Sequence, residues 1–322
     1  MKRALFVTLT AALSIAACKQ SGPAPAPKHR PPATEPAVAN QPAPAGAAAD
    51  SWTKEPPTKD PLARPLFWSI ERDGKTSYAL GTIHVGVDAE ARLPKIVWDQ
   101  IDSTRTFAME TDLTDPVLQK ILACMKCSLR KDLGATYWAK LEAVLGEDLA
   151  ARIEPMKPMV AATMMSLRGL PTTTQMDTLL LARAQNAKKT IVYLEPAAKE
   201  GALLEKWMTV KALKAMLDDV KGGEQHTKEM LDAYIAGDEA RMVKLSEDEK
   251  QTALEHGYTA AEYDESMQDM LYVRNAAWIA PIEKLHAAGG GFIAVGAMHL
   301  VGPKNVLELL AGKGYKITRV TP

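Results

Sequence analysis

The sequence has no excess of charge of either sign. Its 322 residues include 39 basic and 39 acidic side chains, so the formal net charge at pH 7 is zero. A nucleic-acid-binding protein usually shows a basic groove or stripe, and the charge balance gives no support for one. We therefore expect no nucleic acid among the partners.

Long hydrophobic runs are also missing, except near the start of the chain. A membrane-spanning helix needs ~20 predominantly apolar residues in a row. The start has a basic pair at residues 2–3, a shorter apolar stretch over 4–15, and two alanines directly before Cys18. This arrangement is typical of a bacterial lipoprotein signal peptide, which predicts cleavage before Cys18 and lipidation of its side chain. An ordinary cleaved signal peptide with an incidental cysteine is the alternative.

A segment rich in proline and alanine follows the predicted lipidation site. Residues 18–61 contain almost nothing that could form a core. Such a segment reaches between ~35 Å as a coil and ~120 Å as stiff polyproline II. We therefore predict a signal peptide over 1–17, a lipidated tether over 18–61 and a folded domain over 62–322. The predicted location is the cell envelope, lipid-anchored, at the periplasm-facing outer membrane.

Cysteine is scarce in the rest of the chain. Only Cys124 and Cys127 follow Cys18, in a Cys-x-x-Cys arrangement. A thioredoxin-type redox centre places this motif after a strand and at a helix start, whereas here it follows the helical pattern of residues 116–122. Because export leads to an oxidising compartment, we interpret the pair as a local structural disulfide or a thiol pair rather than as a redox catalyst.

The folded part contains few strand patterns and many helical ones. Short apolar runs predict six strands, of which the first two form a hairpin: 66–70, 76–80, 106–109, 190–194, 291–295 and 315–320. Apolar residues recur at helical spacing over 113–187 and over 198–285. Continuous apolar runs are typical of strands buried on both faces of a parallel sheet. We therefore predict an α/β fold with a mixed, partly parallel central sheet that is flanked and capped by helices.

Two segments near opposite ends of the predicted domain share one pattern. Each is an apolar strand followed by Gly-x-x-His and a further glycine, and the histidines are His84 and His299. A glycine permits a sharp exit from the strand, so the histidine is presented at the carboxyl edge of the sheet. His226 completes a third Gly-x-x-His match without a preceding strand, in what we interpret as a polar turn, and we treat that match as accidental. A hydrogen-bonded structural histidine is the alternative for the other two.

Two further predicted strands end in an acid, at Glu110 and Glu195. Ligands of open α/β sheets bind beyond the carboxyl ends of the strands. If the four strands share a sheet and a direction, these acids converge with His84 and His299. Because Pro196 is a good helix-start residue, a helix N-terminal acid is an equally good interpretation of Glu195.

Taken in order along the chain, these features resemble the TraB/GumN family and, through it, the Tiki membrane-tethered metalloproteases. The resemblance spans about residues 66–320, with landmarks at 81–86, 109–113, 176–177, 194–195, 274–275 and 296–302. In that wider superfamily the two Gly-x-x-His motifs and a carboxylate are associated with a divalent metal and with peptide hydrolysis. The fold that the resemblance implies is a sheet flanked by helices.

The resemblance also implies roles for the matching residues. They are metal ligands at His84 and His299, a ligand or general base at Glu110, and supporting catalytic or substrate-binding groups at Glu195 and Arg274. Without the resemblance, Arg274 would be interpreted as one partner of a surface ion pair. Asp177 is the least secure landmark, because Met176 replaces the small or branched residue expected before it.

These observations predict an envelope-tethered, metal-dependent hydrolase that acts as a peptidase. Two imidazoles and a carboxylate with an open position would lower the pKa of a bound water and polarise a substrate carbonyl. A nitrogen and oxygen ligand set without thiolate suits zinc, manganese or cobalt. The alternative is a non-catalytic metal- or ligand-binding envelope lipoprotein, since no His-Glu-x-x-His signature is present. The expected partners are the membrane, through Cys18, and a peptide or small-molecule substrate.

Overall fold

The computed structural model describes residues 60–322, apart from residues 113, 123, 125, 169 and 171–174. The predicted signal peptide, Cys18 and almost all of the predicted tether lie outside the described residues. Leu62 and Leu66 are buried in the core around the sheet, so the packed structure includes the first residues of the predicted domain. None of the described helices is long and apolar enough to cross a membrane.

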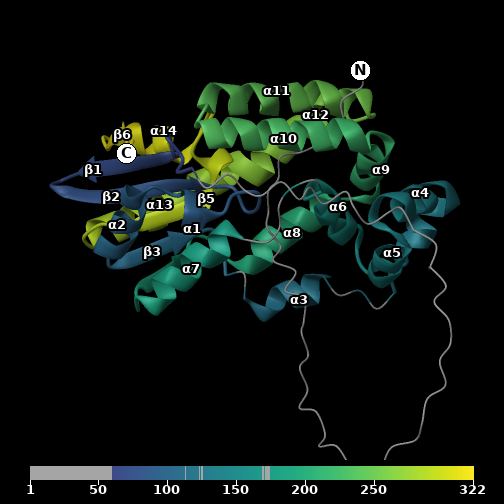
Figure 1. The fold of residues 1–322 in the computed structure, drawn as a ribbon, viewed down its shortest axis with the longest axis horizontal. Helices are drawn as coiled ribbons and strands as arrows, with labels where there is room; N and C mark the ends of the chain where they lie inside the picture. The colour runs from purple at the N-terminus through teal and green to yellow at the C-terminus, as the bar shows by residue number, and fades with distance from the viewer. Residues whose placement is uncertain (1–59, 113, 123, 125, 169, 171–174) are drawn as a thin grey trace, which may run out of the picture.

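A six-stranded sheet forms one end of the molecule (Figure 1). Its strands are β1 (Phe67–Arg72), β2 (Lys75–Thr82), β3 (Thr106–Met109), β4 (Thr190–Tyr193), β5 (Phe292–Gly296) and β6 (Lys316–Arg319). They lie in the order β4-β3-β5-β2-β1-β6. β4, β3, β5 and β2 are mutually parallel, whereas β1 is antiparallel to both β2 and β6. The predicted mixed, partly parallel sheet is confirmed.

The hairpin of β1 and β2 turns where the sequence predicted it. Asp73 and Gly74 have φ angles of 50° and 71°, and a two-residue turn with two positive φ values matches the twist of the flanking strands. The hairpin also reverses the chain, so that β2 runs in the same direction as β5.

Helices fall in both regions where the apolar spacing predicted them. The α-helices are α1 (Ala89–Arg92), α2 (Lys95–Ser103), α3 (Pro116–Leu122), α4 (Leu129–Leu145), α5 (Glu147–Ile153), α6 (Pro158–Ser166), α7 (Met176–Asn186), α8 (Ala197–Trp207), α9 (Val210–Asp218), α10 (Val220–Ala236), α11 (Glu239–Glu255), α12 (Ala260–Met267), α13 (Val273–Ala287) and α14 (Val306–Ala311). A π-helix, η1 (Gln268–Tyr272), joins α12 to α13, and a short 3₁₀-helix, η2 (Ala297–His299), follows β5. Figure 1 shows α10 and α11 side by side along one edge and α4 and α5 at the end away from the sheet.

The two larger hydrophobic cores of the described residues lie around the sheet and among the helices at the other end of the molecule. Around the sheet, the ring of Phe292 on β5 stacks with Phe107 on β3 and with Phe67 on β1, at centroid distances of 6.0 and 5.8 Å. The second core is formed by helices alone and includes Leu141 of α4 and Leu213 of α9, both fully buried. Helix α8 contributes Leu204 to this helical core and starts directly after the carboxyl end of β4. It therefore connects the sheet edge to the helical end of the molecule.

Candidate functional site

The two Gly-x-x-His motifs lie against each other, because β2 and β5 are neighbouring parallel strands. A Cβ atom on Gly81 would lie 3.1 Å from the Cα atom of Ala297, so the glycine of the first motif lets the second motif pack directly on it. The glycines that follow the two histidines, Gly86 and Gly302, have φ angles of 98° and 77°, which favour glycine. The strands that carry the motifs therefore share a sheet and a direction, which is the condition that the sequence set for their convergence.

The imidazole of His84 is held by a carboxylate. Its Nδ1 lies 2.6 Å from Oδ2 of Asp177, at the start of α7, and the hydroxyl of Thr82 donates to Oδ1 of the same carboxylate over 2.8 Å. All three side chains are buried. Because Nδ1 donates to the carboxylate, Nε2 is the nitrogen left for chemistry.

The imidazole of His299 is held by an amide. Its Nδ1 lies 2.6 Å from Oδ1 of Asn275, whose Nδ2 donates to the carbonyl of Lys304 over 3.0 Å. The second contact fixes the orientation of the amide, so Nδ1 of His299 is the donor and Nε2 carries the lone pair. The ring also packs on Trp278 at a centroid distance of 4.4 Å.

Arg274 lies at the centre of the acidic groups. Its Nη2 donates to Oε2 of Glu110 over 2.7 Å, its Nε donates to Oε1 of Glu195 over 2.6 Å, and its Nη1 lies 3.4 Å from Nε2 of His299. Only 3% of its side chain is exposed, so the surface ion-pair interpretation is wrong. The guanidinium also donates to the carbonyl of Met270 in η1, the π-helical turn just before it. Such turns are frequent at functional sites.

The predicted residues surround one point near the backbone of Gly296. The amide of Gly296 donates to Oε1 of Glu110 over 2.6 Å. A Cβ atom at this position would lie 3.2 Å from Oε1 of Glu110, 3.6 Å from Cδ2 of His299 and 3.8 Å from Nε2 of His84. The structure thus brings His84, Glu110 and His299 together at the carboxyl ends of β2, β3 and β5. Among the residues it describes, no three His, Cys, Asp or Glu side chains form a ready metal-ligand group.

Arg274 contacts two of the atoms that a metal ion would need as ligands. Its Nη2 donates to Oε2 of Glu110, and its Nη1 lies 3.4 Å from Nε2 of His299. The sequence left two interpretations of Glu195 open, a helix N-terminal acid and a residue of the site, and the structure agrees with both. It directly precedes Pro196, the N-cap of α8, and it is buried against Arg274.

Three contributors to the site were not assigned a role from the sequence. Asp177 and Asn275 were only landmarks, and Glu200 was not noticed. Glu200 lies on the buried face of α8 with Ala197, Gly201 and Leu204, at a spacing that normally carries apolar side chains. A carboxylate among apolar residues at helical spacing is the signal in the sequence that could have indicated a buried role for Glu200.

The electrostatic environment makes the two histidines different. Burial lowers the pKa of His299 to about 3, with help from the charges of Arg274 and His84 and against that of Glu110, so this imidazole is neutral at pH 7. Burial also opposes protonation of His84, but the charge and hydrogen bond of Asp177 outweigh it and raise the pKa of His84. One imidazole is therefore a neutral donor of a lone pair, and the other is a better base.

The surroundings shift the pKa values of two carboxyl groups, Glu110 and Glu200, in opposite directions. Burial disfavours the charge of Glu110, yet the charges of His299, Arg274 and His84 and the Gly296 amide hold the pKa of Glu110 at about 2. Burial, together with the charges of Glu110 and Glu195, raises the pKa of Glu200 to about 7 against the influence of Arg274. At neutral pH the site thus contains one carboxylate fixed in its charged form and one group able to exchange a proton.

These shifts predict that the metal-free protein loses stability in acid. The pKa of His299 is about 3 in the fold and ~6.5 in an unfolded chain, so its contribution is present above ~6.5 and is lost as the pH falls toward 3. Glu110 acts in the same sense between ~4.5 and 2, whereas His84, with a raised pKa, contributes below ~6.5 and opposes the loss. Urea unfolding in chelator at pH 7 and pH 4 should show that His299→Gln loses less stability than the parent, by up to ~3 kcal/mol. Equal losses would contradict this.

Gly296→Ala should fill the space between the ligands without straining the backbone. Gly296 has a φ of −52°, which alanine adopts readily, while the added methyl group meets Glu110 at 3.2 Å. We expect a loss of unfolding free energy of ~1–2 kcal/mol and, for the hydrolysis that the sequence predicts, a loss of activity on the order of 10²-fold. The matched control is Gly312→Ala, whose methyl group finds only ordinary contacts at 3.5 Å. Full activity of Gly296→Ala would show that this space is not used.

The third Gly-x-x-His match is not in a turn, and that interpretation was wrong. His226 lies inside α10, is buried, and has its Nε2 2.8 Å from Oε1 of Glu249 on α11. It links two helices and lies outside the ligand set around Gly296. A substitution at His226 is therefore expected to reduce stability, so it is unsuitable as a silent control.

A disulfide joins Cys124 to Cys127 in the structure, with Cα atoms 5.5 Å apart. The pair lies after α3 and before α4, away from the carboxyl ends of the parallel strands. It does not lie within a helix, although a helix precedes it as the sequence indicated. None of the contacts around Gly296 involves it.

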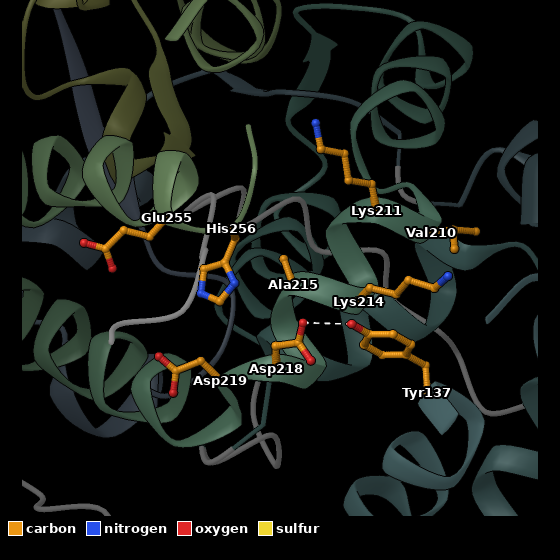
Figure 2. A pocket seen from close by; sticks show the side chains of 9 residues that line it. All are labelled: Tyr137, Val210, Lys211, Lys214, Ala215, Asp218, Asp219, Glu255 and His256. Atoms are coloured by element: carbon orange, nitrogen blue, oxygen red, sulfur yellow. Dashed lines mark hydrogen bonds between the residues drawn. The ribbon is translucent and has the colours of Figure 1, made fainter. Parts of the chain in front are cut away.

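A cleft of about 840 Å³ lies elsewhere, between α4, α9 and the end of α11 (Figure 2). Figure 2 shows Lys211 and Lys214 on one side of it and Asp219 and His256 on the other. None of the predicted site residues lines this cleft. It is therefore separate from the site at the strand ends.

Comparison with protein families identifies the class to which this fold and site belong. The model of the TraB/PrgY/gumN family matches residues 66–319, which is most of the chain. The protein is a member of the TraB/PrgY/gumN family. Comparisons with curated proteins and with solved structures gave no match.

Proposed function

We propose that the domain is a metal-dependent hydrolase that cleaves peptide bonds in substrates at the cell envelope. The observation that supports this best is the orientation of the two histidines. Asp177 and Asn275 hold the Nδ1 atoms of His84 and His299, so Nε2 of each imidazole is the nitrogen available to a metal. Nε2 of His299 lies 3.7 Å from Oε2 of Glu110, and Nε2 of His84 faces the space at Gly296. Metal-binding histidines almost always have their second nitrogen held in this way.

The types of donor fit a divalent cation. Two imidazole nitrogens and a carboxylate suit zinc, manganese or cobalt. Glu110 and Glu195 are both buried against the single guanidinium of Arg274, and Asp177 adds a further carboxylate behind His84. An excess of buried acids over bases favours a bound cation. When bound by His84, His299 and Glu110, the metal would supply Lewis acidity and a more acidic water.

The remaining chemistry is assigned to the side chains of the protein. Arg274 is fixed by two carboxylates and by the carbonyl of Met270, so its guanidinium is a preorganised positive charge that can stabilise negative charge developing on a substrate oxygen beside it. Glu200, whose pKa is raised to about 7, can hold and release a proton near neutral pH. His84 keeps its proton on the side of Asp177, so the lone pair of its Nε2 is directed to the metal.

A second candidate function is binding without turnover, and one observation favours it. Arg274 satisfies Glu110 and Glu195 together, so the acids of the site are already paired within the fold. A protein that holds a metal or small ligand needs no group free for proton transfer. In that case the purified protein would bind metal yet hydrolyse no member of a peptide and ester library.

The deciding experiment combines metal analysis with hydrolysis by the purified full chain. The parent should retain a stoichiometric divalent metal and cleave peptides, and Glu110→Gln should lose both because it removes the charged oxygen donor. Glu90→Gln, at an exposed position of α1, is the matched control and should keep both. Metal binding and cleavage that survive Glu110→Gln would exclude Glu110 as a ligand or base.

The envelope location rests on the predicted lipid at Cys18, and it predicts a simple fractionation result. Cys18→Ala should release the protein from the membrane fraction or stall its processing, because several acyl chains on one residue anchor a protein stably. Membrane fractionation and the mass of the mature N-terminus measure this. A variant that matures and partitions like the parent would show that Cys18 carries no lipid.

A further inference from the structure

A second cavity lies at the carboxyl end of β5, next to the site around Gly296. It has a volume of about 490 Å³ and is formed by α11, by the stretch from α12 through η1, and by the loop after β5. Its apolar lining includes Val243, Met267, Leu271, Tyr272, Met298 and Val301. None of the residues assigned to catalysis lines it.

The cavity and the site share a wall. Met298 lines the cavity and directly precedes His299, both within η2. Leu271 lines it from η1, one helical turn before Arg274. The two short segments that place His299 and Arg274 in the site therefore present neighbouring side chains to the cavity. A group bound there would contact the two segments that carry His299 and lead into Arg274.

The chemistry of the cavity suits an apolar guest. Two charged residues of its lining, Lys250 and Asp264, pair with each other at 2.6 Å. Ser246, Glu247 and Gln268 add polar groups to a lining that is otherwise mainly apolar. Two of the lining residues are methionines, which adapt to guests of different shape. The volume falls in the ~300–1,000 Å³ range of small-molecule sites, so it accommodates an aromatic ring or a long aliphatic chain.

We propose that this cavity is a specificity subsite for a large apolar side chain of the peptide substrate, adjacent to the bond that is cleaved. The proposal rests on the proposed hydrolase function, since it names the class of substrate for the same site. It commits to an aromatic or long aliphatic side chain of a peptide and predicts discrimination against alanine.

The test fills the cavity without touching the site. Val243 on α11 overhangs the loop after β5, where a Cβ atom on Gly302 would lie 3.5 Å from it. Val243→Trp should block the cavity, and Leu254→Trp, at a position of the same helix that is 37% exposed and outside the lining, is the matched control. Isothermal titration of the full chain uses two probes, N-acetyl-phenylalanine amide and N-acetyl-alanine amide.

The parent and Leu254→Trp should bind the phenylalanine probe at least tenfold more tightly than the alanine probe, and Val243→Trp should lose that preference. If thermal melting shows that Val243→Trp does not fold, Met267→Glu places a charge on the half-buried wall and should have the same effect. An equal affinity of the parent for the two probes would overturn the proposal. Tighter binding of dodecanoate than of the phenylalanine probe, blocked by Val243→Trp, would also overturn it in favour of a lipid.

Hydrolysis of two peptides that differ only in phenylalanine or alanine separates the two proposals. Probe preference without any cleavage leaves the cavity as a binding site and removes the hydrolase function. Cleavage with the same kcat/KM for both peptides, unchanged by Val243→Trp, supports the hydrolase and removes the subsite. Cleavage that favours phenylalanine in the parent but not in Val243→Trp supports both.

Discussion

Replacing either His84 or His299 with alanine is expected to remove the bound metal and to lower hydrolytic activity by on the order of 10³-fold or more. Nε2 of His84 and Cδ2 of His299 face the same space at Gly296, and each imidazole is held by its own hydrogen bond, to Asp177 or Asn275. Because both act through one centre, the double variant should be little worse than either single variant. Metal content and kcat/KM measured on the same preparations test this.

The control for the histidine variants is His256→Ala, which alters a half-buried imidazole in the cleft of Figure 2. It should leave metal content and activity unchanged. Additive losses in the double variant, or retention of metal in both single variants, would contradict a shared centre. Asp177→Asn should lose ~10–100-fold in metal affinity, as is usual when the group behind a ligand is altered.

The sheet and the convergence of the site were predictable from the sequence because both depend on local patterns. The apolar runs before Gly81, Glu110 and Gly296 end where the parallel strands end, and a parallel sheet brings such ends to one edge. The convergence of two motifs more than 200 residues apart was predicted only on the condition that their strands share a sheet and a direction, and the structure fulfils that condition.

The partners behind the ligands were not predictable in the same way. Asp177 is at the start of α7 and Asn275 is near the start of α13, so their contacts depend on how helices pack over the sheet edge. Sequence spacing gives the face of a helix but not the neighbour that this face meets. His226 illustrates the same limit, because its position inside α10 and its contact with Glu249 depend on the pairing of α10 with α11.

Without the family resemblance, the sequence predicted a surface ion pair for Arg274, and this was wrong for a physical reason. An arginine in a helix is usually exposed. Only the tertiary arrangement of the strand ends and helices buries Arg274 between Glu110 and Glu195. The π-helical turn of η1 just before it is likewise a tertiary feature, since nothing in the residues 268–272 marks it in the sequence. Burial changes the meaning of the residue, because a buried pair that loses one partner leaves an uncompensated charge.

Arg274→Met is therefore expected to lower the free energy of unfolding by ~3–5 kcal/mol, since it leaves two buried carboxylates without their common cation. Arg274→Lys should fall between the parent and Arg274→Met, because one ammonium group cannot reproduce the fork that contacts Glu110 and Glu195 at once. Urea unfolding in chelator at pH 7 measures these losses. The matched control is Arg183→Met, which removes an exposed pair with Asp102 and should cost less than ~1 kcal/mol.

Adding zinc to the same variants tests whether Arg274 and a metal compete for Glu110. Loss of the guanidinium frees Oε2 of Glu110, so zinc should stabilise Arg274→Met more than it stabilises the parent, through the linkage of binding to folding. The triple change that also replaces His84 and His299 with alanine should abolish this gain. If zinc stabilises Arg274→Met no more than it stabilises that triple variant, Glu110 and the two histidines do not hold the ion. The guanidinium of Arg274 is then a structural partner of the acids and does not compete with a metal for Glu110.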